Sequence, residues 1–430
     1  MTDRIALEKQ PGTSAKLLTR KIRCMRVAAE LAEQRKGERR PKESRGHSRV
    51  TTALRGSERP PKESGSRKKF GGGSWRPIFT QPIRVHMPTK ARSQSACMKE
   101  FNMKQNTMRK FISLGLLLLL VIAFSVSSSY FLTSDNIISI FRDASVVGII
   151  GTGLTFVILT GGIDLSTGSM MGVVGMVMAN IYQYTLLPIW FMLLIGIAVG
   201  IIAGLFNGFI VTRLHVPEFI ATLSTLEIFR AITYVIAIKK NGLITSQPLK
   251  AVDFVWLGGG IGGLYYVIIV FVLMVVIGQI ILKYTRFGTN LYAIGSNVKA
   301  AKLSGINIER TRLLAYAAVG FSVAVATIFQ TARMQNTTVL IGMGMEFNVI
   351  AAAVVGGCAL AGGRGDVIGT FTGALFMATL NNGIYKYQIN TSYQLIMKGA
   401  IIICVVIFDS WYNKKMARAS KEQKSREAAA

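Results

Sequence analysis

The feature that most limits the fold of this chain is the grouping of its apolar residues into long runs. The run "FISLGLLLLLVIAF" at 111–124 is the clearest example, and several comparable runs follow it. About 20 apolar residues in a helix are needed to cross the roughly 30 Å hydrocarbon core of a bilayer. Hydrophobic residues make up 50% of the 430 residues and charged residues only 17%, which is typical of a membrane protein. The sequence therefore predicts an all-α polytopic membrane protein.

About ten transmembrane helices are expected from the positions of these runs. Their boundaries lie near 110–130, 144–160, 167–184, 187–211, 219–238, 263–283, 313–332, 346–361, 367–384 and 393–410. Several runs are short or interrupted by glycine, so about nine to eleven spans fit the pattern. The first run continues into "SVSSSYF" without a persuasive small-residue cleavage site. The first helix is therefore interpreted as an uncleaved anchor.

The distribution of Lys and Arg predicts the orientation, because positive residues collect in cytoplasmic loops. With a cytoplasmic N-terminus, the later inside loops hold fourteen such residues: Arg213, Lys283, Arg286, Lys299, Lys302, Arg310, Arg312, Arg364, Lys414, Lys415, Arg418, Lys421, Lys424 and Arg426. The outside loops hold six: Arg142, Lys239, Lys240, Lys250, Arg333 and Lys386. Both termini are therefore expected to face the cytoplasm.

The segment 1–97 differs in character from the rest of the chain. It holds 24 Lys and Arg against 8 Asp and Glu, a net +16 of the total +29, and has no apolar run. Its low complexity predicts a basic disordered extension. Because Met98, Met103 and Met108 stand directly before the first run, the extension is interpreted either as an over-extended reading frame or as a real cytoplasmic tail. With few aromatic residues it gives little support to nucleic-acid binding. The transmembrane domain is expected over 98–430.

A repeated glycine pattern suggests an internal duplication. Shifting the sequence by 201 residues places Leu159, Ser169 and Asn180 on Leu360, Thr370 and Asn381. The same shift superimposes the repeat glycines: Gly161, Gly162, Gly168 and Gly172 on Gly362, Gly363, Gly369 and Gly373. Such glycines can simply allow close helix packing, but the matched Leu, Asn and hydroxyl residues favour a duplicated unit. Internal repeats around a central site are typical of transporters.

The first copy, "LTGGIDLSTGSM", places Asp164 between two apolar stretches. A carboxylate there is costly unless it meets water or a partner, so Asp164 is a candidate functional residue. The alternative is structural: Asp164 or Ser166 caps the next helix by accepting its free N–H groups. We expect Asp164 to shape a turn beside the translocation path, mainly by capping.

The longest inside loop, 283–312, contains "KAAKLSG", which resembles the E-A-A-x3-G coupling loop of ABC importer permeases. Ala300, Ala301 and Gly305 match that pattern, and Lys299 replaces its Glu. Together with "GGIDLSTGS", "GLFNGFIVTRLHVPEFIATLSTL", "AAAVVGGCALAGGRGDVIGTFTGAL" and "LNNGI", the chain resembles the ribose/xylose/galactose-type monosaccharide permeases from about 110 to 410. The resemblance is to the branched-chain amino acid/sugar permease superfamily.

This resemblance implies a type II ABC importer-like fold in the bacterial plasma (inner) membrane. Two permease copies would form the pore as a homodimer, a separate ATP-binding subunit would use ATP and Mg, and a periplasmic or lipid-anchored binding protein would deliver the sugar. The loop residues Lys299, Ala300, Ala301 and Gly305 would seat in a groove of the ATPase. No cofactor or metal is expected on this chain, and no nucleic-acid partner.

Polar residues inside the expected spans are candidates for the substrate path. Glu227 and Arg230 are three residues apart on one helix face, and we favour a structural ion pair between them over a sugar contact. Asn207 and Asn381 offer amide groups suited to sugar hydroxyls, although amides also bond helix to helix. Phe206 and Tyr385 would supply aromatic faces.

Other function classes have less support. The chain lacks G-x4-G-K-[ST], so it is not itself the ATPase. Its four cysteines and three histidines show no paired or metal-ligand spacing, and no nucleophile and base are arranged for catalysis. Two alternatives stay open: a permease of the same fold for a branched amino acid, a nucleoside or a furanosyl signal, and an ion-coupled transporter. Transport by the purified chain alone would favour the second.

Overall fold

The computed structural model describes residues 113–185, 187–239, 242–250 and 252–386, and six isolated positions between 393 and 407. These residues belong to one compact unit, Asn102–Met416. The other unit comprises Met1–Phe101 and Ala417–Ala430. The expected extension 1–97 and the boundary at 98 therefore lie outside the described residues, as does most of the expected helix 393–410.

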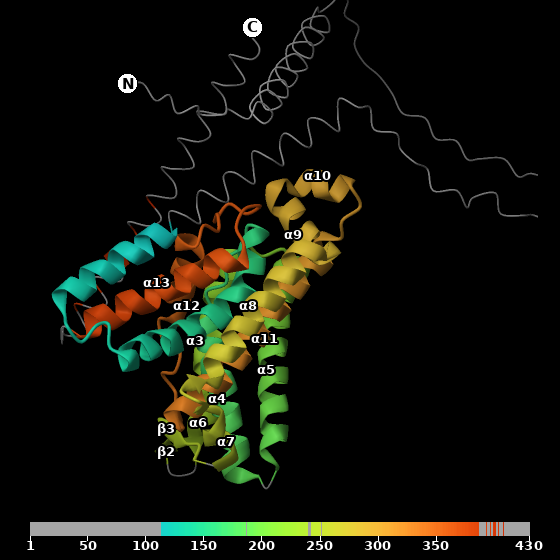
Figure 1. Cartoon of the computed structure of the whole chain (residues 1–430). Coiled ribbons are helices and arrows are strands. Elements are labelled where there is room, and N and C mark those ends of the chain that lie inside the picture. Colours follow the sequence, from blue (N-terminus) through green and yellow to red (C-terminus); the bar gives the residue numbers. More distant parts are fainter. Residues whose placement is uncertain are drawn as a thin grey trace, which may run out of the picture. The chain divides into compact units, whose positions relative to one another are not determined.

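Helices make up nearly all of the described unit (Figure 1). A first helix, Ser113–Ser127, precedes the labelled series. The long helices are α3 (Ser134–Leu159), α4 (Thr167–Tyr184), α5 (Ile189–Arg213), α6 (Glu218–Ala237), α8 (Tyr266–Tyr284), α11 (Ile308–Met334) and α13 (Val367–Lys386). The shorter ones are α7 (Val252–Leu257), α9 (Arg286–Ser296), α10 (Val298–Leu303) and α12 (Met345–Val355).

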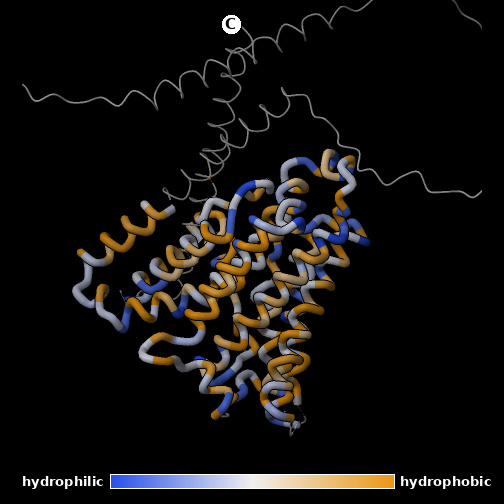
Figure 2. Tube along the Cα trace, turned by 45° about the vertical axis from the view of Figure 1, so that its right-hand side comes forward, coloured by the Kyte–Doolittle hydropathy of each residue, from blue (hydrophilic) through white to orange (hydrophobic). Residues whose placement is uncertain are grey.

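Six of the described helices are long and apolar enough to cross a membrane: α3, α5, α6, α8, α11 and α13. Along these helices hydrophobic residues predominate, while hydrophilic residues gather towards the two ends (Figure 2). The expectation of a polytopic helical membrane protein is confirmed. Nine of the ten expected helices are present among the described residues, with shifted ends.

Two boundaries differ from the sequence prediction for physical reasons. Helix α3 begins at residue 134 and not near 144, because its charged residues find partners: Asp143 pairs with Arg333 at 2.6 Å, and Arg142 lies 3.8 Å from the ring centroid of Tyr265. Helix α12 ends at Val355 and has only 11 residues, or about 16 Å at 1.5 Å per residue. It is too short to cross the bilayer.

Helix α4 lies at the centre of the unit and is mostly buried, although it is not among the six helices that are apolar enough to cross a membrane. Its glycines form one packing face: Gly168 lies against Glu346 and Gly342, and Gly172 lies against Thr233 of α6. A similar glycine contact joins α5 to α11, where a Cβ atom on Gly200 would approach the carbonyl oxygen of Gly320 to 2.5 Å. Small residues allow such close helix packing in membranes.

The two ends of the helix bundle carry different structures (Figure 1). Helices α9 and α10 lie at one end. At the other end are α7 and three antiparallel pairs of short strands: β1 (Ile238–Lys239) with β2 (Gly242–Leu243), β3 (Ser246–Pro248) with β6 (Asn336–Thr338), and β4 (Gly260–Ile261) with β5 (Leu264–Tyr265). The β3–β6 pair joins the segment after α6 to the segment after α11, and so fixes these two helices at that end.

Candidate functional site: two glycine turns and the loop that holds them

The first glycine turn, residues 160–166, links α3 to α4 and encloses a fully buried carboxylate. Asp164 Oδ1 accepts hydrogen bonds from the backbone N–H of Ser166 at 2.9 Å and from its hydroxyl at 2.7 Å. Asn207 of α5 donates through Nδ2 to Ser166 Oγ at 2.7 Å and lies 3.5 Å from both carboxylate oxygens. Asp164, Ser166 and Asn207, which the sequence also makes candidates for the substrate path, thus form one buried cluster.

The predicted cap of α4 is wrong in its atomic detail. Ser166 occupies the N-cap position, but neither its side chain nor that of Asp164 accepts a hydrogen bond from the first turn of α4. The Asp164 carboxylate instead reaches the N–H two residues ahead, which is the side-chain turn that Asp commonly forms. In the second copy Asp366 does cap its helix, since Gly369 N–H donates to Asp366 Oδ1 at 2.7 Å.

The second glycine turn, residues 361–366, links α12 to α13 and lies against the first. The N–H of Gly363 donates to the carbonyl oxygen of Leu159 at 2.9 Å. Gly362 has φ +82°, and a Cβ atom there would lie 2.7 Å from the backbone nitrogen of Gly161, which has φ +88°. Glycine is needed at this approach because a side chain would meet backbone atoms of the other turn. The repeat glycines therefore bring the two copies into direct contact.

Helix α9 of the predicted coupling loop packs onto both turns. A Cβ atom on Gly295 would come closer than 3.0 Å to the carbonyl oxygen of Leu159 and to the backbone nitrogen of Gly363. The hydroxyl of Tyr292 donates to the carbonyl oxygen of Gly365 at 2.8 Å. Burial and the nearby Asp366 raise the pKa of Tyr292, so its phenol stays neutral and keeps the proton that it donates.

The start of α11 and the start of α6 hold the first turn from the other side. Arg312 pairs with Glu218 at 2.7 Å, and its second guanidinium nitrogen lies 3.4 Å from the carbonyl oxygen of Thr160. Thr222 donates to the carbonyl oxygen of Ile163 at 3.1 Å. We call the two turns, with Tyr292, Gly295, Arg312 and Glu218, the turn junction. These four residues were not predicted as site residues from the sequence, although a charged residue at the start of each of two apolar helices is a usable signal.

Helix α10 contains most of the predicted coupling motif. Asn297 caps it by accepting from Ala300 N–H at 3.1 Å, and Gly305 beyond its end has φ +78°. Lys299, Ala300 and Gly305 are exposed, but Ala301 is only 3% exposed and packs inside the chain. The expectation that both alanines face a partner is therefore wrong for Ala301. The most exposed large apolar side chain of the helix is Leu303, at 90%.

The predicted ion pair between Glu227 and Arg230 is not formed. Arg230 donates to the carbonyl oxygens of Val339 at 2.7 Å and of Ile341 at 3.2 Å, and is attracted by the buried Glu346. Glu227 is exposed on the surface of α6 and has no ion pair with any residue that the structure describes. Glu227 still attracts Arg230 electrostatically, but the two side chains form no ion pair and Arg230 binds backbone carbonyls instead.

The remaining path candidates lie apart from the buried cluster. Asn381 is half-buried on α13, and its side-chain oxygen has no hydrogen-bond partner there. Its neighbour Asn382 donates to Asn136 of α3 at 3.0 Å, so this amide bonds helix to helix. Phe206 and Tyr385 are exposed at the surface of α5 and α13.

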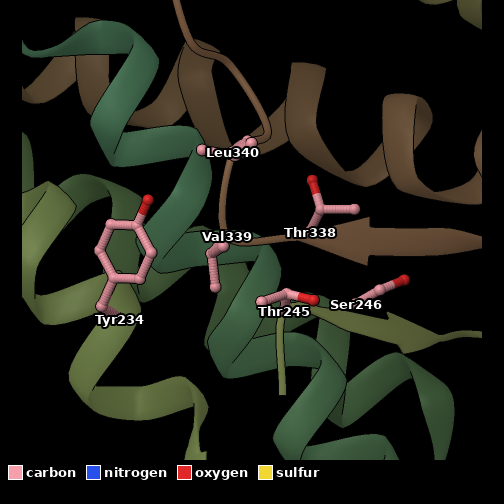
Figure 3. Close-up of a pocket in the computed structure, with 6 residues that line it drawn as sticks. All are labelled: Tyr234, Thr245, Ser246, Thr338, Val339 and Leu340. Carbon is pink, nitrogen blue, oxygen red and sulfur yellow. The ribbon is translucent and has the colours of Figure 1, made fainter. Parts of the chain in front are cut away.

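A pocket of about 440 Å³ opens at the end of the bundle opposite α9 and α10. It is lined by Tyr234, Thr245, Ser246, Thr338, Val339 and Leu340 (Figure 3). Hydroxyl groups come from α6 and from both strands of the β3–β6 pair. The carbonyl of Val339, which Arg230 binds, belongs to the same lining segment. No predicted path residue lines it.

Comparison with known proteins identifies the family. The family described as branched-chain amino acid transport system / permease component matches residues 136–406. The ribose import permease protein of Haemophilus influenzae is 36% identical over 308 residues, which cover 71% of this chain and 94% of that protein. The ribose import permease protein of Bacillus subtilis is 36% identical over 298 residues, covering 69% and 91%. The D-allose transport system permease protein of Escherichia coli is 34% identical over 327 residues, covering 76% and 99%. The chain belongs to this family of ABC importer permeases and is a membrane-spanning transporter subunit, not an enzyme.

Proposed function

We propose that this chain is the translocation subunit of a bacterial monosaccharide importer. The names of its relatives, which are permeases for ribose, xylose and D-allose, support a neutral sugar as cargo. The description of the family itself keeps a branched-chain amino acid as the second candidate. In either case the chain moves its cargo without altering it chemically.

The contact between the coupling loop and the two glycine turns is the observation on which the proposed mechanism rests. Helix α9 meets both turns at Gly295, and Arg312 at the end of the loop meets the first turn. A force on α10 would therefore reach the helix breaks of both repeats through packed backbone. Because Gly295 has no side chain to yield, a displacement of α9 must move the turns as well.

The ATP-binding subunit would dock on α10. Lys299, Ala300 and Leu303 are exposed there, and an exposed leucine beside a lysine suits a groove with an apolar floor and an acidic rim. ATP and Mg would be used by that partner. The coupling loop would then be cytoplasmic, as would both termini, in agreement with the bias in Lys and Arg.

The pocket lined by Tyr234 would lie on the external side, where a sugar-binding protein would release its cargo. A second copy of the chain would complete the pore as a homodimer. Three of the six spanning helices expose much of their surface: α5, α6 and α8 are each only 28% buried in their most apolar segment. That surface is available to lipid and to the second copy.

The test is co-purification with the ATP-binding subunit and ATP-driven uptake of ribose in proteoliposomes that also contain the binding protein. Leu303→Asp should reduce both at least tenfold. Leu264→Asp, a matched exposed leucine at the opposite end, should leave co-purification unchanged. Normal co-purification of the Leu303 variant would contradict the docking site, and uptake by the purified chain alone would favour an ion-coupled transporter.

A further inference from the structure

Glu227 stands near the middle of a spanning helix with its side chain exposed. Helix α6 runs from Glu218 to Ala237, so Glu227 lies about 14 Å from one end and about 15 Å from the other at 1.5 Å per residue. The neighbouring exposed side chains are apolar, among them Leu223 at 44% and Ile228 at 46%. A carboxylate at this depth cannot face hydrocarbon without a large cost. This face of α6 must therefore meet water or a polar partner.

Within the part of the chain that the structure describes, Glu227 is attracted electrostatically by Arg230 but makes no ion pair with it. Arg230, the cation nearest in sequence, is already bound to two backbone carbonyls. No ion pair forms between Glu227 and any described residue. The described residues therefore leave the Glu227 carboxylate without an ion-pair partner on an exposed face of α6.

On α6 the exposed polar residues Ser224 and Glu227 share a stripe with the small Ala231 and the half-buried Tyr234, and this stripe leads to the pocket. Ser224, Glu227, Ala231 and Tyr234 follow each other at intervals of three or four residues and so share one face. Ser224, Glu227 and Ala231 are exposed, and Tyr234 lines the pocket together with hydroxyl residues of β3 and β6 (Figure 3).

Helix α8 provides the contrast. Its exposed side chains are all large and apolar between 269 and 280: Ile269, Val272, Leu273, Val276, Ile277 and Ile280. Such a face suits lipid. The difference between the two helices sets the α6 stripe apart as a surface suited to water or a polar partner.

We propose that the α6 stripe lines the conduit for the sugar and that Glu227 contacts the cargo at its midpoint. This inference rests on the proposed function. An ionised carboxylate accepts hydrogen bonds only, so it can bind two neighbouring sugar hydroxyls at once. It also repels anions, so the conduit selects uncharged polyhydroxyl solutes over sugar phosphates and sugar acids. The ring of Tyr234 provides an aromatic face for the C–H groups of the sugar on the way in.

Cysteine accessibility tests whether the stripe faces water. In proteoliposomes containing the complete importer, and in a functional background whose four native cysteines are replaced, Glu227→Cys is treated with a charged, membrane-impermeant thiol reagent. The control is Val276→Cys on α8, which lies near the middle of its helix, about 15 Å from one end and about 12 Å from the other at 1.5 Å per residue, and is 47% exposed. The thiol at position 227 should react at least about tenfold faster than the control thiol on α8. Ribose at saturating concentration should lower the reaction rate at position 227. Equal rates at the two positions would overturn the proposal.

Uptake by charge variants tests the contact itself. Glu227→Gln keeps an acceptor oxygen and should retain ribose uptake within about threefold, while Glu227→Leu should lower it at least about tenfold with normal assembly. Val276→Leu should transport like the unmodified chain. Normal uptake by the Leu variant would overturn the contact. If the unmodified importer moves no monosaccharide while residue 227 still reacts rapidly, the cargo assignment fails and the hydrated stripe stands.

Discussion

Replacing Gly295 with alanine should separate the coupling loop from the glycine turns. The new methyl group would overlap the carbonyl oxygen of Leu159 and the backbone nitrogen of Gly363. Both are backbone atoms, so no rotamer change can relieve the contact. Helix α9 must move away from the turns, or the turns from each other.

The size of the effect follows from three contributions. Overpacking of this kind costs about 1–3 kcal/mol. Loss of the 2.9 Å hydrogen bond from Gly363 N–H to Leu159 would add about 1 kcal/mol. Alanine regains about 1 kcal/mol through its higher helix propensity. The net loss of junction stability should be about 1–3 kcal/mol, which corresponds to roughly a 5- to 150-fold change in an equilibrium constant.

The measurement is ATP-driven ribose uptake at fixed complex concentration, together with ATPase co-purification and thermal unfolding in detergent. Gly295→Ala should keep the ATPase bound, because α10 is unchanged, and should lose at least most of its uptake. Gly115→Ala is the matched control, since the glycine is also helical and a Cβ atom there would have no neighbour within 4 Å. If the two variants behave alike, α9 does not transmit force through this contact.

Three further predictions concern the turns and the extension. Asp164→Asn should transport almost normally, because Asn207 has an unpaired oxygen that can turn towards the new amide, whereas Asp164→Ala should lose about 1–3 kcal/mol in thermal unfolding; equal damage at normal protein levels would show that the charge matters. Tyr292→Phe removes the bond to the Gly365 carbonyl and should lower unfolding stability by about 1 kcal/mol, and an unchanged midpoint would contradict this. A chain that begins at Met98 should insert and take up ribose normally, and lost uptake would show that the extension is required.

The long apolar runs predicted the helices well, because a helix that is buried in lipid or protein needs a long stretch of apolar residues. The expected spans 187–211 and 263–283 correspond to α5 and α8 within a few residues. The start of α3 could not be predicted in this way. Its charged residues, Arg142 and Asp143, fit inside a spanning helix only because distant parts of the chain supply their partners. Arg333 pairs with Asp143, and the ring of Tyr265 lies against Arg142.

The repeat pattern predicted the position of the two helix breaks but not their meeting. Positive φ at Gly161 and Gly362 is a local property, and the paired glycines signal it. The two turns touch each other, and α9 lies over both. This arrangement depends on how the helices pack in three dimensions, which a local sequence pattern does not contain. Likewise, the identity of the buried alanine in "KAAKLSG" depends on which face of α10 rests on the chain.

Glu227 and Arg230 do not pair, because Arg230 binds backbone carbonyls at a helix break. Residues three apart on a helix can pair, and that rule predicted an ion pair. Between β6 and the short α12, however, residues 339–344 leave the helical path, and backbone carbonyls at that depth need donors. Arg230 satisfies two of them, those of Val339 and Ile341, and lies beside Glu346. Its charge is thus used to stabilise the break, and Glu227 stays exposed on α6 without an ion pair to any described residue. The same break therefore shapes the pocket lining and leaves Glu227 in the position that the proposed conduit requires.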